Sequence, residues 1–189
     1  MTNAIIKDGS ASPEAGCADD FYFSQRSRDM QTKATIERHP IHPMLVVLPI
    51  GLWVFSLICD IVIRAGGNPA WVPAAYYAMG VGIIGALAAA IFGLIDLLSI
   101  PQGTRARKLG YWHLGINLSV TVLFIVNFYL RSVGPPVDLT PFILSIVGIA
   151  ALLVSGWLGG EMVYVEGVAV SPPAKPAVTE EEAGLKKAA

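Results

Sequence analysis

The sequence predicts an all-α integral membrane protein, with four spanning helices in an up-down-up-down bundle and flexible polar tails at both ends. Its composition is the first reason: 54 % of the 189 residues are apolar, 14 % are charged, and the mean hydropathy is +0.60. Soluble domains carry about 25 % charged residues, so an ordinary soluble domain is excluded. The placement of charge is the second reason, because residues 44–160 hold 8 of the 27 charged side chains and the other 72 positions hold 19.

Four apolar stretches supply the third reason. A helix needs roughly 20 residues to cross the ~30 Å hydrocarbon layer of a bilayer. The stretches of that length run over residues 44–63, 72–98, 111–130 and 141–158. Each is apolar on all sides, which leaves no helix face for water and excludes a soluble bundle. We therefore expect a four-span transmembrane domain at 39–166, with cytoplasmic tails at 1–38 and 167–189.

The segments between these stretches are short. They cover residues 65–71, 99–110 and 131–140 and contain Gly and Pro or, in the second segment, basic residues. Short connections make consecutive helices antiparallel neighbours. The first and third helices then lie on one diagonal of the bundle, and the second and fourth on the other.

Lysine and arginine are distributed unequally over the two sides of this bundle. The two tails and the 99–110 segment carry eleven of them, whereas the first and third connections carry Arg64 and Arg131. Positive residues stay on the cytoplasmic side, so both termini are predicted to be cytoplasmic. The first 25 residues lack the uninterrupted apolar segment of a signal peptide, which agrees with this orientation in a bacterial inner membrane.

Charge and cysteine content exclude other classes of protein. The net charge of −1 gives no basic surface for nucleic acid. The two cysteines, Cys17 and Cys59, form neither a disulfide framework nor a Cys-x-x-Cys metal clip. No spacing of Ser, Cys and His indicates a nucleophile with its base, so we assign no catalytic residues.

Small residues recur every fourth position on two of the expected helices. They are Gly85, Ala89 and Gly93 on the second, and Gly156 and Gly160 on the fourth. This spacing lets helix backbones approach closely in lipid. It predicts packing within the bundle, with a homodimer seam as the alternative.

Ionisable side chains at membrane depth are the main functional signal. Each costs ~2.5–3.5 kcal/mol on insertion scales and is a functional candidate for that reason. With the termini cytoplasmic, five such residues fall at the cytoplasmic level of the bundle: His39, His42, Asp96, His113 and Glu161. All three histidines of the chain are among them.

The positions of these residues at helix ends favour metal binding on the cytoplasmic side of the bundle. Pro43 suits a first helical position, which makes His42 resemble an N-cap residue, and His113 also follows a helix start. A positive helix end favours neutral imidazole, the form that binds metals. Asp96 and Glu161 lie at C-terminal ends, where the helix dipole repels an anion, so each needs a metal, a haem environment, an arginine or a proton.

The diagonal arrangement lets His42 face His113 across the bundle axis. Neighbouring helix axes ~8–10 Å apart place the two inward Cα atoms roughly 7–9 Å apart. This gap suits one transition metal ion or a hydrogen-bond network. A haem b with two axial histidines needs the helices to lie further apart at the cytoplasmic end. We expect His42 and His113 to bind the cofactor. The candidate metal ligands are His39, His42, His113, Asp96 and Glu161.

The same residues also have structural interpretations. His39 can be an interfacial residue held between prolines, and His113 can belong to an aromatic interface belt. Asp96 and Glu161 can each pair with an arginine. The candidate arginines are Arg38, Arg105 and Arg107.

Three polar residues away from this level are expected to be structural. Asp60 is predicted to pair with Arg64, four residues further along the same helix. Asn117 and Asn127 are expected to tie neighbouring helices together.

The motifs HPIHPM, GLIDLLSIP and GWLGGEMVY resemble those of the bacterial membrane protein family called domain of unknown function 2231. The resemblance covers about residues 39–170 and implies a four-span bundle with His39, His42, Asp96, His113 and Glu161 at motif positions. Some relatives are joined to Rieske-type or other redox domains, which implies an electron-transfer setting. The chain departs from the family pattern at Val165 and Glu166, where relatives often carry an Arg-His or Arg-Tyr pair.

These observations lead to three hypotheses. The first is an inner-membrane protein that binds a metal or haem b at the cytoplasmic side and serves a redox-linked membrane complex. The second is a cofactor-free accessory subunit in which the polar cluster is a hydrogen-bonded plug. The third is a small proton or solute transporter, which the position of the cluster at one membrane end favours less.

Overall fold

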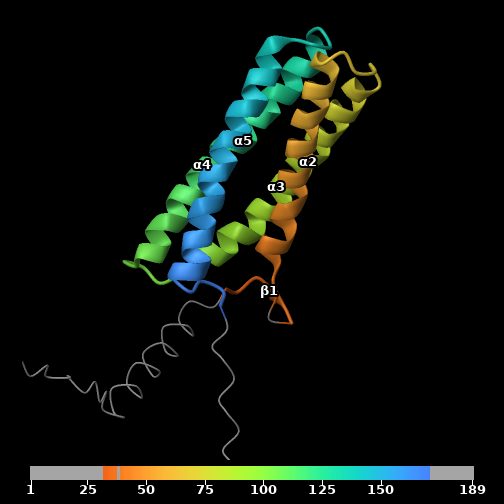
Figure 1. The fold of residues 1–189 in the computed structure, drawn as a ribbon. Coiled ribbons are helices and arrows are strands. Elements are labelled where there is room, and N and C mark those ends of the chain that lie inside the picture. The colour runs from red at the N-terminus through yellow and green to blue at the C-terminus, as the bar shows by residue number, and fades with distance from the viewer. Residues whose placement is uncertain (1–31, 38, 171–189) are drawn as a thin grey trace, which may run out of the picture.

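The computed structural model describes residues 32–37 and 39–170, and most of the expected tails lie outside these residues. Four long helices make up the described chain (Figure 1). They are α2 (Ile41–Arg64), α3 (Trp71–Ser99), α4 (Arg105–Val133) and α5 (Leu139–Gly160), and a π-helical turn, η1 (Glu161–Val165), follows α5. All four long helices are long and apolar enough to cross a membrane.

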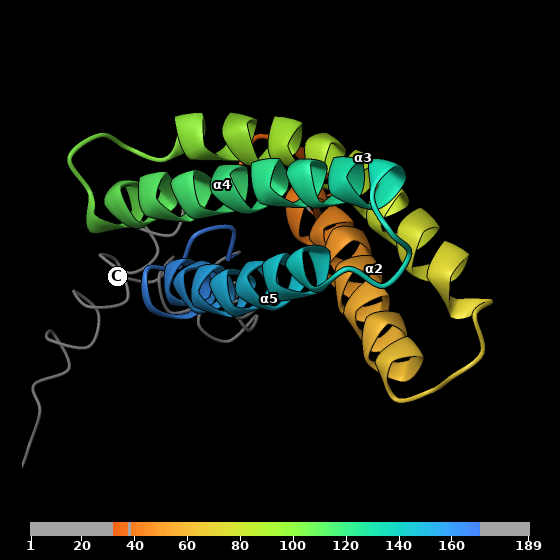
Figure 2. The ribbon, with the colours of Figure 1, turned by 90° about the horizontal axis from the view of Figure 1, so that it is seen from above.

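The helices form the predicted up-down-up-down bundle. The most extensive packing is between α2 and α3 and between α4 and α5, so the bundle consists of two helical hairpins. Contacts between α3 and α4 are fewer, and those between α2 and α5 fewer still. Figure 2 shows that the α2–α3 hairpin is inclined to the α4–α5 hairpin. The prediction of an all-α four-helix membrane fold is confirmed.

The helix starts differ from the prediction in two places. Helix α4 begins at Arg105, capped by the Thr104 side chain, which accepts a hydrogen bond from the Arg107 amide at 3.2 Å. The basic residues expected in a loop therefore lie in the first turn of α4. Helix α2 begins at Ile41 with Pro40 at its N-cap, so His42 lies inside the first turn and is not the cap.

The short segments before and after the four helices pack against the same end of the bundle. Strand β1 (Thr35–Ile36) pairs antiparallel with β2 (His39–Pro40). In the segment after η1, Val168 is buried in a cluster with Leu97, Ile100 and Ala106. Residues 34–37 and 167–170, which were expected to belong to the tails, are thus part of the packed structure.

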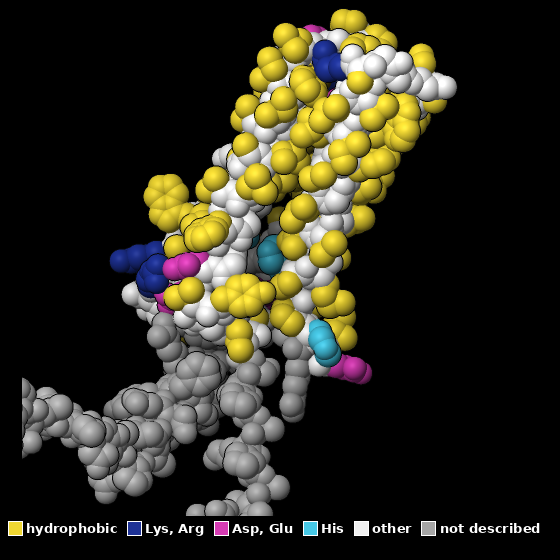
Figure 3. All heavy atoms as spheres, in the orientation of Figure 1, with side chains coloured by type: hydrophobic (Ala, Val, Ile, Leu, Met, Phe, Trp, Pro, Cys, Tyr) yellow, Lys and Arg dark blue, Asp and Glu magenta, His cyan; other side chains and the backbone are white. Residues whose placement is uncertain are grey.

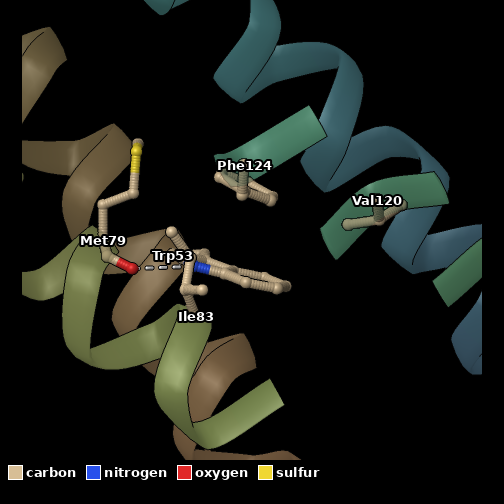
Figure 4. Packing of buried hydrophobic residues seen from close by; sticks show 5 residues of the cluster. All are labelled: Trp53, Met79, Ile83, Val120 and Phe124. Atoms are coloured by element: carbon tan, nitrogen blue, oxygen red, sulfur yellow. Dashed lines mark hydrogen bonds between the residues drawn. The ribbon is translucent and has the colours of Figure 1, made fainter. Parts of the chain in front are cut away.

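The centre of the bundle is an aromatic contact across one diagonal. The rings of Trp53 on α2 and Phe124 on α4 stack with centroids 4.1 Å apart and an interplanar angle of 11°. Figure 4 shows them among Met79, Ile83 and Val120, with the indole N–H donating to the Met79 carbonyl oxygen at 3.3 Å. The two hairpins therefore meet through large side chains at mid-depth.

The outer surface of the bundle is apolar. In each candidate span, 17–28 % of the most hydrophobic window is buried inside the protein. Figure 3 shows hydrophobic side chains over most of the visible helix surface. An exposed apolar surface of this extent is unfavourable in water, so lipid is its natural environment.

A buried ion pair joins α2 to α4 at the end of the bundle opposite the histidines. Arg131 donates to both carboxylate oxygens of Asp60, one at 2.7 Å, and both side chains are nearly buried. Asn127 and Ser145 also accept hydrogen bonds from Arg131, at 3.0 and 3.2 Å. Two parallel N–H···O bonds to a carboxylate are among the strongest side-chain hydrogen bonds.

The predicted pairing of Asp60 with Arg64 is therefore wrong. Arg64 is the last residue of α2. Its guanidinium donates a hydrogen bond to the carbonyl oxygen of Asp138 and lies over the Phe142 ring, with Cζ 4.4 Å from the ring centroid. The facing helix supplies a better partner because Arg131 can approach the carboxylate end-on, away from water.

We expect Asp60→Asn to destabilise the protein by about 3–5 kcal/mol, because it leaves the buried Arg131 without its counter-ion. Exchanging the two charges, with Asp60→Arg and Arg131→Asp together, should recover much of the loss. The measurement is thermal unfolding in mild detergent, with Asp138→Asn as the control at the same end. A loss no larger than that of the control would contradict the importance of this pair.

Candidate functional site

His42 is fixed by the neighbouring helix of its own hairpin. Its Nδ1 lies 2.8 Å from the backbone carbonyl oxygen of Ala89 on α3. A carbonyl oxygen can only accept, so Nδ1 donates, and Nε2 is the unprotonated nitrogen of the neutral ring. Gly93, one turn beyond Ala89, makes room for the imidazole: a Cβ at this position would lie 2.7 Å from His42 Cε1.

His113 is held in the same way in the second hairpin. Its Nδ1 lies 3.0 Å from the carbonyl oxygen of Ser155 on α5, which again makes Nδ1 the donor and leaves Nε2 unprotonated. The Ser155 hydroxyl is also 3.0 Å from Nδ1 and accepts a hydrogen bond from Asn117 at 2.5 Å. Gly159, one turn beyond Ser155, lies against this ring.

The two imidazoles meet across the bundle axis. Their centroids are 6.3 Å apart and their planes are inclined by 84°. The hydrogen bonds of both rings involve Nδ1, and no side-chain nitrogen or oxygen in the described region is both buried and without a partner. Both Nε2 atoms therefore border accessible space. Figure 3 shows a histidine side chain in a narrow recess between the two hairpins.

Asp96, at the same end of the bundle, makes a hydrogen bond to the backbone and not to a histidine. Its Oδ1 accepts a hydrogen bond from the backbone N–H of Ala34 at 3.0 Å. The Ala34 carbonyl in turn accepts from the Ile41 amide at 2.9 Å. Asp96 thus ties the segment before α2 to the last turn of α3.

Glu161 forms an ion pair, as one of its structural interpretations predicts. Arg105, in the first turn of α4, donates to Glu161 at 2.7 Å and to Glu166 at 3.0 Å. The π-helical turn η1 carries Glu161. This pair connects the start of α4 to the segment after α5.

His39 lies apart from the other two histidines. It belongs to β2, is exposed, and donates from Nδ1 to the carbonyl oxygen of Glu37 at 3.1 Å. Within residues 32–37 and 39–170, no three His, Cys, Asp or Glu side chains are grouped so that they could hold a metal ion. The five candidate residues therefore do not form a single ligand set there, and the bundle brings His42 and His113 together.

Sequence reasoning missed the groups that orient the imidazoles. These are two backbone carbonyls, at Ala89 and Ser155, and the glycine one turn beyond each. The four-residue spacing from Ala89 to Gly93 was visible as a small-residue pattern, but its role beside a histidine was not. Asn117 and Asn127 do tie α4 to α5, as predicted, through Ser155 and Ser145.

Comparison with protein families matches residues 38–172 to the family described as "Predicted membrane protein (DUF2231)". The chain belongs to this family. Searches of curated proteins and of solved structures found no match. Membership of DUF2231 agrees with a membrane-spanning bundle, and the matched region contains both His42 and His113.

The arrangement of the histidine pair suits metal binding. Metal-binding histidines usually donate their second N–H to a carbonyl or carboxylate, which fixes the ring and its tautomer. Both imidazoles of this DUF2231 chain have that support, and their ring centroids lie 6.3 Å apart. Neighbouring carboxylates are engaged elsewhere, so the pair itself is the candidate site.

We expect Gly93→Ala to destabilise the protein by about 1–3 kcal/mol, because the added methyl group overpacks the His42 ring. Gly156→Ala is the matched control, since no atom would lie within 4 Å of its Cβ. An alanine there should be neutral or stabilise α5 by up to about 1 kcal/mol. Thermal unfolding in detergent distinguishes the two, and equal midpoints would contradict the tight packing at Gly93.

Proposed function

We propose that this protein binds a metal centre, as a metal ion or haem b, through Nε2 of His42 and His113. The observation that carries the proposal is the hydrogen bonding that the two rings share. Each donates Nδ1–H to a carbonyl oxygen of its own hairpin, at 2.8 and 3.0 Å. The nitrogen that carries no proton in each neutral ring is Nε2, and its lone pair is the one that a metal would use.

The setting supports a redox-linked membrane subunit over a soluble enzyme. The pair lies near one end of a membrane bundle, where the two hairpins meet. Where the surroundings of a metal are apolar, its ligands and its burial set its reduction potential. The proposed role is therefore to hold a redox-active centre near one membrane surface, within a larger membrane complex.

The orientation that we propose places the histidine end in the cytoplasm of a bacterial cell, at the inner membrane. Arg105, Arg107 and Lys108 lie at the start of α4, at this end. Arg64 and Arg131 lie at the opposite end, where each has an acceptor inside the protein. The positive-inside rule favours the cytoplasm for the first group.

We expect His42→Ala and His113→Ala each to abolish retention of the centre. Each variant removes one of the two proposed ligands. His39→Ala and Asp138→Asn are the controls, since one changes an exposed histidine and the other a carboxylate at the opposite end of the bundle. The measurement is metal content by mass spectrometry, with an optical spectrum of the same detergent-purified sample.

Two results would contradict this function. Full occupancy in both histidine variants would place the centre elsewhere. A metal-free wild-type protein that takes up neither added metal ions nor haem would favour the cofactor-free accessory subunit. In that case the histidine variants should change only stability or partner binding.

Topology can be tested separately by cysteine labelling. In a background with Cys17→Ser and Cys59→Ala, we expect Val137→Cys to react with a membrane-impermeant maleimide on intact spheroplasts. Gln102→Cys, in the connection at the histidine end, should react only after lysis. The reverse pattern would place the histidines on the outer side of the membrane.

A further inference from the structure

The two hairpins are structural repeats of each other. Three contacts join α2 to α4 across the bundle: His42 with His113, Trp53 with Phe124, and Asp60 with Arg131. In each pair the α4 residue lies 71 positions after the α2 residue, the separation recorded for the ion pair. Three contacts at one constant offset indicate equivalent positions on the two helices.

Helices α3 and α5 repeat with their own constant offset. The carbonyl that holds His42 belongs to Ala89 and the one that holds His113 belongs to Ser155, 66 positions later (155 − 89). The same difference relates two glycines that pack on the central rings. Gly82 lies against Trp53 and Gly148 against Phe124 (148 − 82).

Further side-chain contacts follow the same two offsets. The buried Ser56 hydroxyl donates to the carbonyl oxygen of Ala75, and the buried Asn127 amide, 71 positions later, donates to that of Pro141. The glycines beside the imidazoles, Gly93 and Gly159, also differ by 66. Both hairpins therefore present equivalent groups to the bundle axis.

The repeats are related by a pseudo-two-fold axis along the bundle. Because α2 and α4 run in the same direction, as do α3 and α5, rotation about that axis superposes one hairpin on the other. The three α2–α4 contacts are layers on this axis. The central layer pairs Trp with Phe, and the layer at one end pairs Asp with Arg, so equivalent positions there carry different residues.

Of these three layers, only the histidine layer has the same residue type on α2 and on α4. It also keeps the same support, a carbonyl oxygen for Nδ1 and a glycine one turn later. A group that lies between the rings on this axis meets two equivalent imidazoles on opposite faces. We infer that this group is an iron porphyrin, haem b, with His42 and His113 as its two axial ligands; this inference rests on the metal-binding function proposed above.

The distance between the rings agrees with axial ligation. A histidine nitrogen lies about 2.0 Å from its metal, and the ring centre lies about 1.1 Å further back. Two imidazoles on opposite sides of one metal thus have centroids about 6.2 Å apart, against about 5 Å for two corners of a tetrahedral site. The observed separation is 6.3 Å.

The number of available ligands gives a second argument. A structural zinc site uses four protein ligands and a catalytic one three, and the described residues offer no group of three. A porphyrin supplies four nitrogens of its own, so its iron needs only two more ligands from the protein. The histidine pair is complete for haem and incomplete for a bare ion.

A flat ligand between the imidazoles would have its edges towards the other diagonal, formed by α3 and α5. At the level of the rings these helices carry Gly93 and Gly159, which have no side chains. The glycines that accommodate the imidazoles also keep bulk away from the macrocycle.

The test is titration of detergent-purified, cofactor-free protein with hemin, followed by reduction with dithionite. We expect one haem per chain with a six-coordinate, low-spin spectrum and sharp bands after reduction. The near-perpendicular ring planes should give the strongly anisotropic low-spin signal in electron paramagnetic resonance. His42→Ala and His113→Ala should each weaken hemin binding by at least about 100-fold, and His39→Ala should not.

A second pair of variants tests the equivalence of the two ligands. His42→Met and His113→Met should both give mixed His/Met ligation, with similar spectra and similar upward shifts in midpoint potential. Circular dichroism checks that each variant is folded. A low-spin wild-type haem whose spectrum changes in only one of these variants would overturn axial ligation by the pair.

Parallel titrations with Zn²⁺, Cu²⁺ and Fe²⁺ separate this inference from the proposed function. Binding of one of these ions that needs both histidines, without hemin binding, would overturn the haem assignment and leave the metal-binding function standing. A high-spin haem in the wild type would also overturn bis-histidine ligation. Binding of neither hemin nor metal ions would overturn both proposals.

Discussion

The stacking of Trp53 on Phe124 is the contact on which the rest of the structure depends. Within lipid, helices gain little from burying apolar surface, so close packing and hydrogen bonds must hold them together. The two hairpins pack tightly within themselves and less with each other. The aromatic stack, made possible by Gly82 and Gly148, fixes how far apart α2 and α4 lie. That distance in turn sets the separation of the imidazoles at one end and the ion pair at the other.

The charged residues close both ends of the bundle and leave the histidines free for another purpose. At one end Asp60 and Arg131 neutralise each other inside the protein. At the other, Asp96 binds a backbone amide and Glu161 pairs with Arg105. Buried charge is tolerated only with such partners. The imidazoles differ because each is held through Nδ1 by a carbonyl oxygen of its own hairpin and makes no ion pair with these charged residues.

The sequence was sufficient to predict the spans, their order and the approach of His42 to His113, because hydropathy and short connections decide these features. It was insufficient where the answer depends on the register between helices. Asp60 had a plausible partner four residues away, yet the register of α2 against α4 brings Arg131 to it instead. Backbone carbonyls such as that of Ala89 carry no sequence signature at all. The internal repeat was hidden for a similar reason, since the equivalent residues are mostly of different types.

The hairpin arrangement also determines the order in which the protein can assemble. Each hairpin is continuous in sequence and contains the contacts that orient its own histidine, so each can enter the bilayer and fold as a unit. Docking of the two hairpins is then a separate, later stage. The two imidazoles approach each other only after docking, and any ligand that bridges them binds the docked state alone. Such a ligand shifts the docking equilibrium towards the complete bundle, in proportion to its free concentration over its Kd.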